Sequence, residues 1–211
     1  MNYFITATDT NAGKTYVTAL LTRAFRKLGL DTLAMKPIAC GDWSDSKILQ
    51  SAAGNTLTLE EITPVYCQTP LAPIHAAQRE GKLFSIDHVL PAFHHLRKKT
   101  SSLLVEGVGG WLALLSPTES LADLACAIQF PILLVVRNRL GAMNHALLTL
   151  ESIKHHGCHC AGIILNHHPD DEGDLAIEGY RHFFKELSQE RKFPIFLEVE
   201  PGQEEISILS L

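Results

Sequence analysis

Short apolar runs alternate with amphipathic stretches along most of the chain. Several of the apolar runs are continuous, which is typical of strands buried on both faces of a sheet. Six runs predict strands: Tyr3–Thr6, Thr32–Met35, Leu103–Val105, Ile132–Val136, Gly162–Leu165 and Ile195–Val199. Apolar residues recur at helical spacing in the stretch that follows Lys14, and further helices are predicted over Ser46–Ala53, Asp87–Lys98, Ser120–Gln129, Ala142–His156 and Gly173–Gln189.

The order of these elements predicts the fold class. Strands that alternate with helices favour an α/β fold, a doubly wound and mostly parallel sheet with helices on both faces. A length of 211 residues suits one such domain over residues 1–211, and we find no internal repeat. Residues 54–86 are the least regular part, and with Pro64, Pro70 and Pro73 they are predicted to form a long functional loop region.

A phosphate-binding loop is predicted between the first strand and the first helix. The sequence Thr10-Asn11-Ala12-Gly13-Lys14-Thr15 places Gly-Lys-Thr at a helix start after a strand. Backbone N–H groups and the helix N-terminus attract a phosphate there. We expect Lys14 to reach the β- and γ-phosphates and the Thr15 hydroxyl to bind Mg²⁺. The strict motif has glycine where Thr8 stands, so the tripeptide alone also allows a plain helix start with a solvated lysine.

Polar residues follow the other predicted strands, and parallel strands bring their carboxyl ends to one edge of the sheet. Glu106 ends an apolar strand, and a carboxylate there can hold Mg²⁺ opposite Thr15. Lys36 ends the second strand and can stabilise charge on a transferred phosphate. Asp45 precedes a predicted helix, where a helix cap and a metal ligand are equally good interpretations. The fifth strand ends at Asn166.

Composition narrows the classes of partner and compartment. Hydrophobic residues make up 46% of the chain, so disorder is not expected, and the net charge of −5 argues against nucleic-acid or anionic-membrane partners. No apolar run approaches the ~20 residues of a membrane span, and no signal-peptide pattern is present. Five cysteines without framework spacing predict free thiols and a cytoplasmic location.

Two crowded groups of histidines and cysteines suggest a metal site as an alternative. They are His155, His156, Cys158, His159 and Cys160, and then His167 and His168. Zinc requires ligands that converge tetrahedrally, and this spacing at a helix-to-strand junction does not indicate such convergence. We therefore predict that these side chains lie at the surface and in turns.

Six segments, in this order along the chain, carry a resemblance to a known family. They are Thr8–Thr15, Lys36–Gly41, Ser44-Asp45, Pro70–Pro73, Val105–Trp111 and Leu140–Thr149. With them the chain resembles the dethiobiotin synthetases, ATP-dependent enzymes that close the ureido ring in biotin synthesis. Together the segments cover most of residues 3–166 and are far more specific than the phosphate loop alone.

The resemblance implies a P-loop NTPase fold, a homodimer whose active site is shared between subunits, Mg²⁺ as cofactor and ATP as co-substrate. The implied substrates are 7,8-diaminopelargonate (7,8-diaminononanoate) and CO₂. In the family mechanism one amine takes up CO₂ as a carbamate, and the carbamate oxygen attacks the γ-phosphate. The second amine then attacks the resulting carbamic-phosphoric anhydride, which gives dethiobiotin, ADP and phosphate.

The resemblance also implies roles for individual residues. The catalytic residues are Lys14, Lys36 and Thr10. The nucleotide-binding residues are Asn11, Ala12, Gly13, Lys14, Thr15, Tyr16 and Asn166, the last of them at the adenine. The metal ligands are Thr15, Asp45 and Glu106. The residues at the diamine are Thr10, Lys36, Cys40 and Gly109. The helix start that binds the substrate carboxylate from the opposite subunit comprises Gly141, Ala142, Met143 and Asn144, with Tyr180 nearby.

The sequence departs from the family at Ala7, usually glycine, at Asn11, often glutamate, and at Cys40, often serine. The segment 198–203 also differs from the family's purine loop, which leaves the preference for a nucleotide base open. Two alternatives remain at this point. One is a dimeric ATPase switch of the partitioning and septum-site type, although Asp9 stands where those proteins carry a second lysine. The other is a related amidoligase with a different acceptor.

Overall fold

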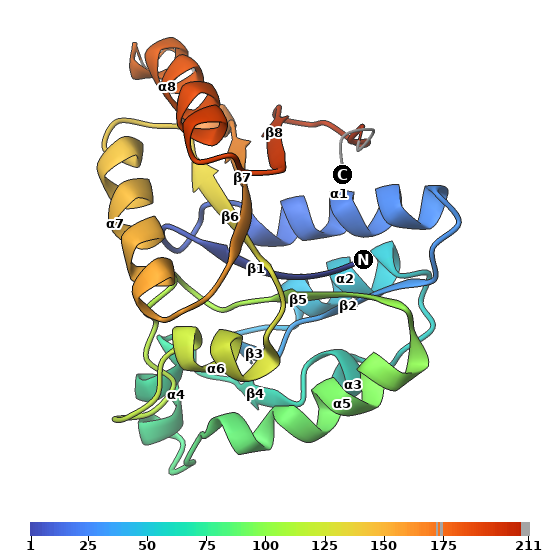
Figure 1. The fold of residues 1–211 in the computed structure, drawn as a ribbon. Coiled ribbons are helices and arrows are strands. Elements are labelled where there is room, and N and C mark those ends of the chain that lie inside the picture. Colours follow the sequence, from blue (N-terminus) through green and yellow to red (C-terminus); the bar gives the residue numbers. More distant parts are fainter. Residues whose placement is uncertain (172, 174, 208–211) are drawn as a thin grey trace.

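The computed structural model describes residues 1–171, 173 and 175–207 (Figure 1). A six-stranded sheet lies at the centre, with the strand order β2-β5-β1-β6-β7-β8 and parallel pairing throughout. Its strands are β1 (Asn2–Ala7), β2 (Thr32–Met35), β5 (Ser102–Glu106), β6 (Ile132–Arg137), β7 (Cys160–Asn166) and β8 (Ile195–Val199). Each of the six predicted strands is confirmed.

Helices cover both faces of this sheet, as predicted. Helices α1 (Lys14–Lys27) and α2 (Ser44–Ala52) pack on one face, and the other face carries α5 (Leu90–Lys99), α6 (Leu121–Ile128), α7 (Ala142–His155) and α8 (Ala176–Glu190). Neighbouring residues of β6 bury their side chains on opposite faces of the sheet. Leu133 packs with residues of α1, and Leu134 packs with residues of α7 and α8. Burial of both faces explains the continuous apolar runs in the sequence.

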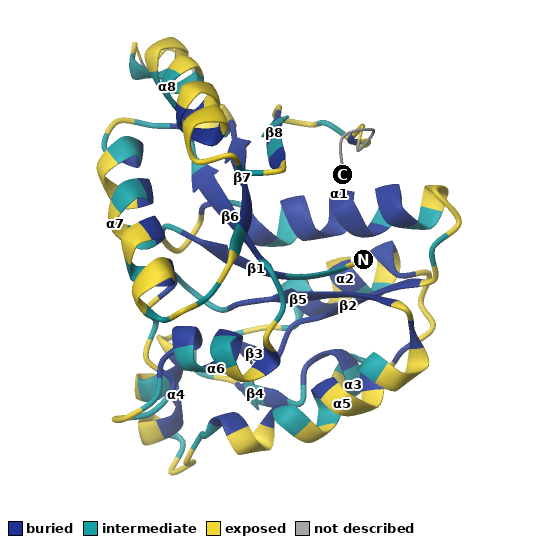
Figure 2. Ribbon diagram, in the orientation of Figure 1, coloured by how far each residue is buried: buried dark blue, intermediate teal, exposed yellow. Residues whose placement is uncertain are grey.

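Burial follows the same layers (Figure 2). The central strands are buried almost throughout, whereas the helices alternate between buried and exposed positions. The last predicted helix begins later than expected, at Ala176, with Gly173 in a turn and residue 174 outside the described part of the chain. None of the helices in the described ranges has the length and apolar character that a membrane crossing requires.

The prediction of one long loop over residues 54–86 is wrong, although the part from Pro70 to Pro73 lines a cavity at the strand ends. This region contains α3 (Leu59–Ile62), β4 (Val65–Cys67) and α4 (Pro73–Arg79), and the turn η1 (Ile86–His88) follows at its end. Strand β4 pairs in parallel with β3 (Ile38–Cys40) and forms a second, two-stranded sheet. Strands of three residues are too short to show a periodicity, which is why the hydrophobic pattern did not reveal them.

Local signals nevertheless mark the two short helices of this region. Thr58 accepts the Glu61 backbone N–H at 3.2 Å, and the Glu61 carboxylate accepts the Thr58 N–H at 2.8 Å, which is a capping box at the start of α3. Pro73 occupies the first turn of α4, where its missing N–H costs nothing. Another single-turn element, η2 (Pro169–Asp171), follows β7.

Candidate active site

A cavity of about 1090 Å³ opens at the carboxyl ends of the central strands. Its walls come from the loop between β1 and α1, the segment from β2 to α2, the loop before α4, the segment after β5, and the ends of β6 and β7. The site residues predicted from the sequence that line it are Thr10, Asn11, Gly13, Lys14, Thr15, Tyr16, Lys36, Cys40, Asp45, Glu106 and Gly109. Residues from Thr10 to Asp170 thus meet at one edge of the sheet, and the direct contact of Lys14 with Gly109 already spans 95 positions.

The loop before α1 has the backbone that a phosphate cradle requires. Gly13 has φ 89°, and a Cβ there would lie 2.1 Å from Nδ2 of Asn166. Asn11 is also left-handed, at φ 59°, a conformation that asparagine tolerates better than most residues. The Asn166 Nδ2 group donates to the Ala12 carbonyl at 3.0 Å and so ties the loop to the end of β7. Ala12 and Asn166 are both buried and lie behind the cavity lining.

Lys14 begins α1 and is almost fully buried, with 7% of its surface exposed. Its ammonium group donates to the Gly109 carbonyl at 2.6 Å and to the Asp9 carbonyl at 3.5 Å. Burial, followed by the neighbouring charge of Lys36, lowers the pKa of Lys14 to about 8. A phosphate bound beside Lys14 would raise this pKa again and keep the ammonium group charged.

Four charged and hydroxyl groups meet beside Lys14. One oxygen of the Glu106 carboxylate, Oε1, accepts the Thr15 hydroxyl and the Lys36 ammonium, each at 2.6 Å. The same ammonium lies 2.9 Å from the Asp45 carboxylate. Burial alone would lower the pKa of Lys36, but Glu106 and Asp45 outweigh it and raise that pKa. Burial would raise the pKa of Asp45, and Lys36 outweighs it and lowers that pKa.

The oxygen groups in this cluster fit a magnesium ion. Glu106 is completely buried, and its second oxygen, Oε2, has no hydrogen-bond partner in the part of the chain described. A buried polar atom without a partner is rare because leaving it unpaired is costly. Carboxylate and hydroxyl oxygens are the ligands that Mg²⁺ prefers, and Thr15, Asp45 and Glu106 present them within one cluster.

The four residues predicted at the diamine, Thr10, Lys36, Cys40 and Gly109, all line this cavity. Burial, followed by the effect of Cys67, raises the pKa of Cys40 to about 12. The Cys40 thiol therefore stays protonated and offers a weak hydrogen-bond donor to a ligand. Cys40, at the position where the family often has serine, is therefore neutral.

The predicted helix start at Gly141 does not lie in this cavity. Gly141, Ala142, Met143 and Asn144 are absent from the residues that line it. Gly141 is the N-cap of α7 with φ 90°, and its N–H donates to the Tyr180 hydroxyl at 3.4 Å. Asn144 is exposed in the first turn. Within one chain, this helix start does not line the cavity, although Arg139, two residues before it, lies 3.8 Å from Asp9 at the phosphate loop.

Sequence reasoning assigned no site role to several residues that line the cavity, among them His168 and Asp170. They follow β7, and the His168 Nδ1 atom lies 3.2 Å from an Asp170 oxygen. The rule that ligands gather beyond strand ends could have found them, since they come directly after Asn166. Arg137, at the end of β6, also lines the cavity and donates to both oxygens of Asp171.

Tyr16 lines the cavity but also has a structural contact. Its hydroxyl donates to the carbonyls of Gln203, at 2.5 Å, and Glu200, at 3.2 Å. This pair of bonds fastens the segment after β8 to the first turn of α1. The segment that differs from the family's purine loop therefore lies next to the nucleotide-binding loop.

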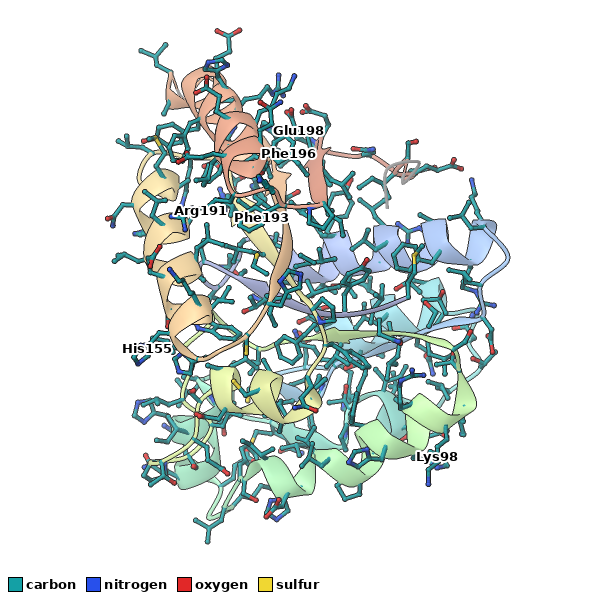
Figure 3. The ribbon with its side chains drawn as sticks, viewed as in Figure 1. Lys98, His155, Arg191, Phe193, Phe196 and Glu198 are labelled. Carbon is teal, nitrogen blue, oxygen red and sulfur yellow. The ribbon has the colours of Figure 1, made fainter. Side chains whose placement is uncertain are left out.

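The histidines and cysteines from His155 to Cys160 do not form a cluster of potential metal ligands among the described residues. Among all the residues that the structure describes, the one group whose side chains lie close enough together to hold a metal ion is His167, Glu198 and Glu200. The Arg181 guanidinium already neutralises both of these carboxylates, with contacts of 2.5 Å to Glu198 and 2.7 Å to Glu200. Glu198 stands on β8 beside α8 (Figure 3). The prediction of a surface and turn role holds for the exposed His155 and His159 as surface residues, but it is wrong for His167, which is buried beside Glu198 and Glu200.

The fold and the site together define a P-loop nucleotide-binding protein. Solved structures with the same fold include the cell division protein FtsY of Thermotoga maritima, with a TM-score of 0.59 and 14% identity. That match covers 97% of this chain and 63% of FtsY. The cell division protein MinD of Aquifex aeolicus has a TM-score of 0.52 and 15% identity, with coverage of 94% and 79%. These likenesses concern the fold alone.

Sequence comparison identifies the family. A family described as an AAA domain matches residues 1–204. The ATP-dependent dethiobiotin synthetase BioD of Akkermansia muciniphila is 39% identical over 203 residues, which cover 96% of this chain and 93% of that protein. The enzyme of the same name from Anaeromyxobacter dehalogenans is 42% identical over 179 residues, with coverage of 82% and 80%. The chain belongs to the dethiobiotin synthetase family.

Proposed function

We propose that this protein catalyses the ATP-dependent carboxylation and ring closure of 7,8-diaminopelargonate with CO₂, giving dethiobiotin, ADP and phosphate in biotin biosynthesis. The observation that carries the proposal is the meeting of Lys14, Lys36, Thr15, Asp45 and Glu106 in one cavity. Two lysines beside a set of oxygen ligands suit phosphoryl transfer, and membership of the family supplies the substrate class.

The first part of the reaction makes the carbamate and transfers the phosphate. An N–C bond forms between one substrate amine and CO₂, with loss of a proton from nitrogen. A carbamate oxygen then attacks the γ-phosphorus, and the bond from that phosphorus to ADP breaks. Lys14 is close to the loop that would cradle the β- and γ-phosphates, and Lys36 would hold the carbamate and its phosphate.

The second part closes the ring. The other amine attacks the carbonyl carbon of the anhydride and loses a proton, the bond from carbon to the phosphate oxygen breaks, and phosphate leaves. Thr10, Cys40 and Gly109 border the space in which the diamine would lie. Mg²⁺, held by Thr15, Asp45 and Glu106, would neutralise charge on the β- and γ-phosphates.

The nucleotide base would lie near the end of β7. The Asn166 amide donates through Nδ2 to the loop and leaves Oδ1 buried without a hydrogen-bond partner among the described residues. Asn166 does not line the cavity, so this oxygen could accept a hydrogen bond from the exocyclic amine of adenine only after the side chains around it move on nucleotide binding. His168 and Asp170 line the cavity near this strand end, and Tyr16, in α1, contacts the segment after β8.

The active site would be completed by a second subunit. The start of α7 lies outside the cavity of its own chain, and a helix N-terminus is a ready site for a carboxylate. In a homodimer, the helix start of one protomer, formed by Gly141, Ala142, Met143 and Asn144, would bind the carboxylate of the substrate in the other protomer.

The five free cysteines support a cytoplasmic location.

The reaction can be tested with oxygen-labelled CO₂. If the carbamate oxygen attacks the γ-phosphate, each phosphate released carries one oxygen from CO₂, and mass spectrometry also detects dethiobiotin. The measurement must be faster than the exchange of label with water. Formation of dethiobiotin with unlabelled phosphate would contradict this route, and the absence of dethiobiotin would contradict the proposed function.

Substitution of Asn144 by alanine is expected to weaken diamine binding much more than ATP binding. An exposed asparagine in the first turn of α7 can donate a hydrogen bond to a carboxylate, and loss of such a charge-assisted bond corresponds to roughly 10- to 100-fold in KM. Steady-state kinetics with each substrate varied would separate the two effects. Thr149→Ala, further along the same helix, is the control. Equal effects on both substrates would contradict the shared carboxylate site.

Nucleotide affinity is expected to fall as the pH rises through about 8. The pKa of Lys14 is lowered to about 8, so its ammonium is mostly charged at pH 7 and mostly neutral at pH 9. Loss of this charge should weaken ATP binding by about tenfold across that interval. Calorimetric titration at pH 7, 8 and 9 would measure it. Lys14→Arg, which stays charged, should give a much flatter profile, and an equally steep profile in that variant would assign the effect to another group.

A further inference from the structure

Asp45 depends for its position on a part of the chain with no assigned role. It lies in the first turn of α2, where the N-cap residue Trp43 makes no side-chain cap and Asp42 Oδ1 accepts the Ser44 N–H at 2.8 Å. Its carboxylate contacts Lys36 at 2.9 Å and is itself 42% exposed, so the local packing around the side chain is slight. The Lys36 ammonium bridges this carboxylate and Glu106, and the anchoring of the helix start sets where the Asp45 backbone lies relative to that ion pair.

The backbone just before α2 is fastened by strand β4 at both of its polar groups. The Gly41 N–H donates to the Cys67 carbonyl at 2.9 Å, and the Gly41 carbonyl accepts the Tyr66 hydroxyl at 2.9 Å. Gly41 has φ 105°, and a Cβ there would come within 3.1 Å of the Pro70 Cβ. The chain thus turns sharply at Gly41, and β4 holds the turn from one side.

Two further contacts join the same segment to the helix start itself. The Trp43 ring stacks on the Tyr66 ring, with centroids 4.2 Å apart and planes inclined by 19°. One turn later, the buried Ser46 hydroxyl bonds to that of Thr63 at 2.6 Å. Tyr66 is the residue that contacts both the turn and the N-cap of α2, through its hydroxyl and its ring.

We propose that Tyr66 is a positioning residue for the metal ligand Asp45, acting through the Gly41 carbonyl and the Trp43 ring. The inference deepens the proposed function, because it rests on Asp45 as a ligand of Mg²⁺. In this proposal the small sheet of β3 and β4 holds the start of α2 so that the carboxylates of Asp45 and Glu106 can bind the same ion. Tyr66 does not line the cavity and does not touch the reacting atoms.

The test uses Tyr66→Phe, which keeps the stacked ring and removes the hydroxyl. Mn²⁺, a spectroscopic substitute for Mg²⁺, would be titrated into the protein with ATP present and followed by electron paramagnetic resonance. We expect its dissociation constant to rise about fivefold, the usual effect of one lost hydrogen bond. Half-saturating Mg²⁺ in the reaction should rise by the same factor, and saturating Mg²⁺ should restore the rate. Tyr66→Leu, which also removes the ring, should shift both values further.

Tyr3→Phe is the matched control, because Tyr3 lies in β1 and contacts Phe25 rather than the site. An unchanged Mn²⁺ dissociation constant in Tyr66→Phe would overturn the inference. So would a lower rate that saturating Mg²⁺ does not restore, which would indicate only a structural role. The metal titration needs no diamine, so a wild-type protein that binds Mn²⁺ with ATP but makes no dethiobiotin would refute the proposed function and leave the inference on Tyr66 intact.

Discussion

Replacing Lys14 by alanine is expected to lower the rate of dethiobiotin formation by about 10²- to 10³-fold, the effect of losing one preorganised charged donor. Lys14 begins α1 and lines the cavity, where its ammonium would contact the phosphates of ATP. The fold should survive, because burial makes the charged form of this lysine unfavourable, as its lowered pKa indicates. Steady-state rates and thermal unfolding would be measured on the same preparations.

The control for this prediction is Lys98→Ala, which removes a lysine of α5 whose side chain points away from the protein (Figure 3). That variant should keep its full rate. If Lys14→Ala kept a near-normal rate, the assignment of the phosphate loop would be wrong. A collapsed thermal transition in Lys14→Ala would instead assign the lysine a structural role through its bond to the Gly109 carbonyl.

The second large effect is expected from Glu106→Gln, which should also lower the rate by about 10²- to 10³-fold. Glutamine has the size of glutamate and can still accept the Thr15 and Lys36 hydrogen bonds through its oxygen. It lacks the negative charge, so Mg²⁺ would lose a ligand and Lys36 would lose one of the two carboxylates that raise its pKa. The rate would be measured as a function of Mg²⁺ concentration.

Half-saturating Mg²⁺ should rise in Glu106→Gln together with the loss of rate. Glu60→Gln, an exposed carboxylate on α3, is the matched control and should leave both quantities unchanged. A lower rate with an unchanged dependence on Mg²⁺ would show that Glu106 acts through Lys36 alone. That result would remove Glu106 from the metal ligands.

Much of the site could be predicted because its strongest signals are local. Gly13, Lys14 and Thr15 stand together in the sequence, and the strand and helix around them are long enough to show their periods. Strand-end reasoning then brought Glu106 and Lys36 to the same edge, and the structure places their charged groups 2.6 Å apart. Asp45 was ambiguous between a helix cap and a ligand, and its contact with Lys36 at 2.9 Å places it in the cluster.

The rest could not be predicted, for physical reasons that differ from case to case. Strands β3 and β4 have three residues each, and their pairing depends on a contact across 25 or more positions rather than on a pattern. The contact of Tyr66 with Gly41 is of the same kind and has no sequence signal. His168 was assigned to a turn, which is correct, but the turn forms a wall of the cavity.

Fold likeness alone would not have decided the chemistry. FtsY and MinD have the same architecture at 14% and 15% identity, and a shared fold supports many functions. The residues that separate the alternatives lie in the site. Asp9 stands where the switch ATPases carry a second lysine, and its carboxylate lies 3.8 Å from the Arg139 guanidinium of the same chain.

The most direct test of the central claim is the release of phosphate from MgATP with bicarbonate present, measured with and without 7,8-diaminopelargonate. The account predicts that phosphate release depends on the diamine and that each phosphate is matched by one molecule of dethiobiotin. Hydrolysis of ATP that is indifferent to the diamine, with no dethiobiotin formed, would contradict the account and favour a switch ATPase or a different acceptor.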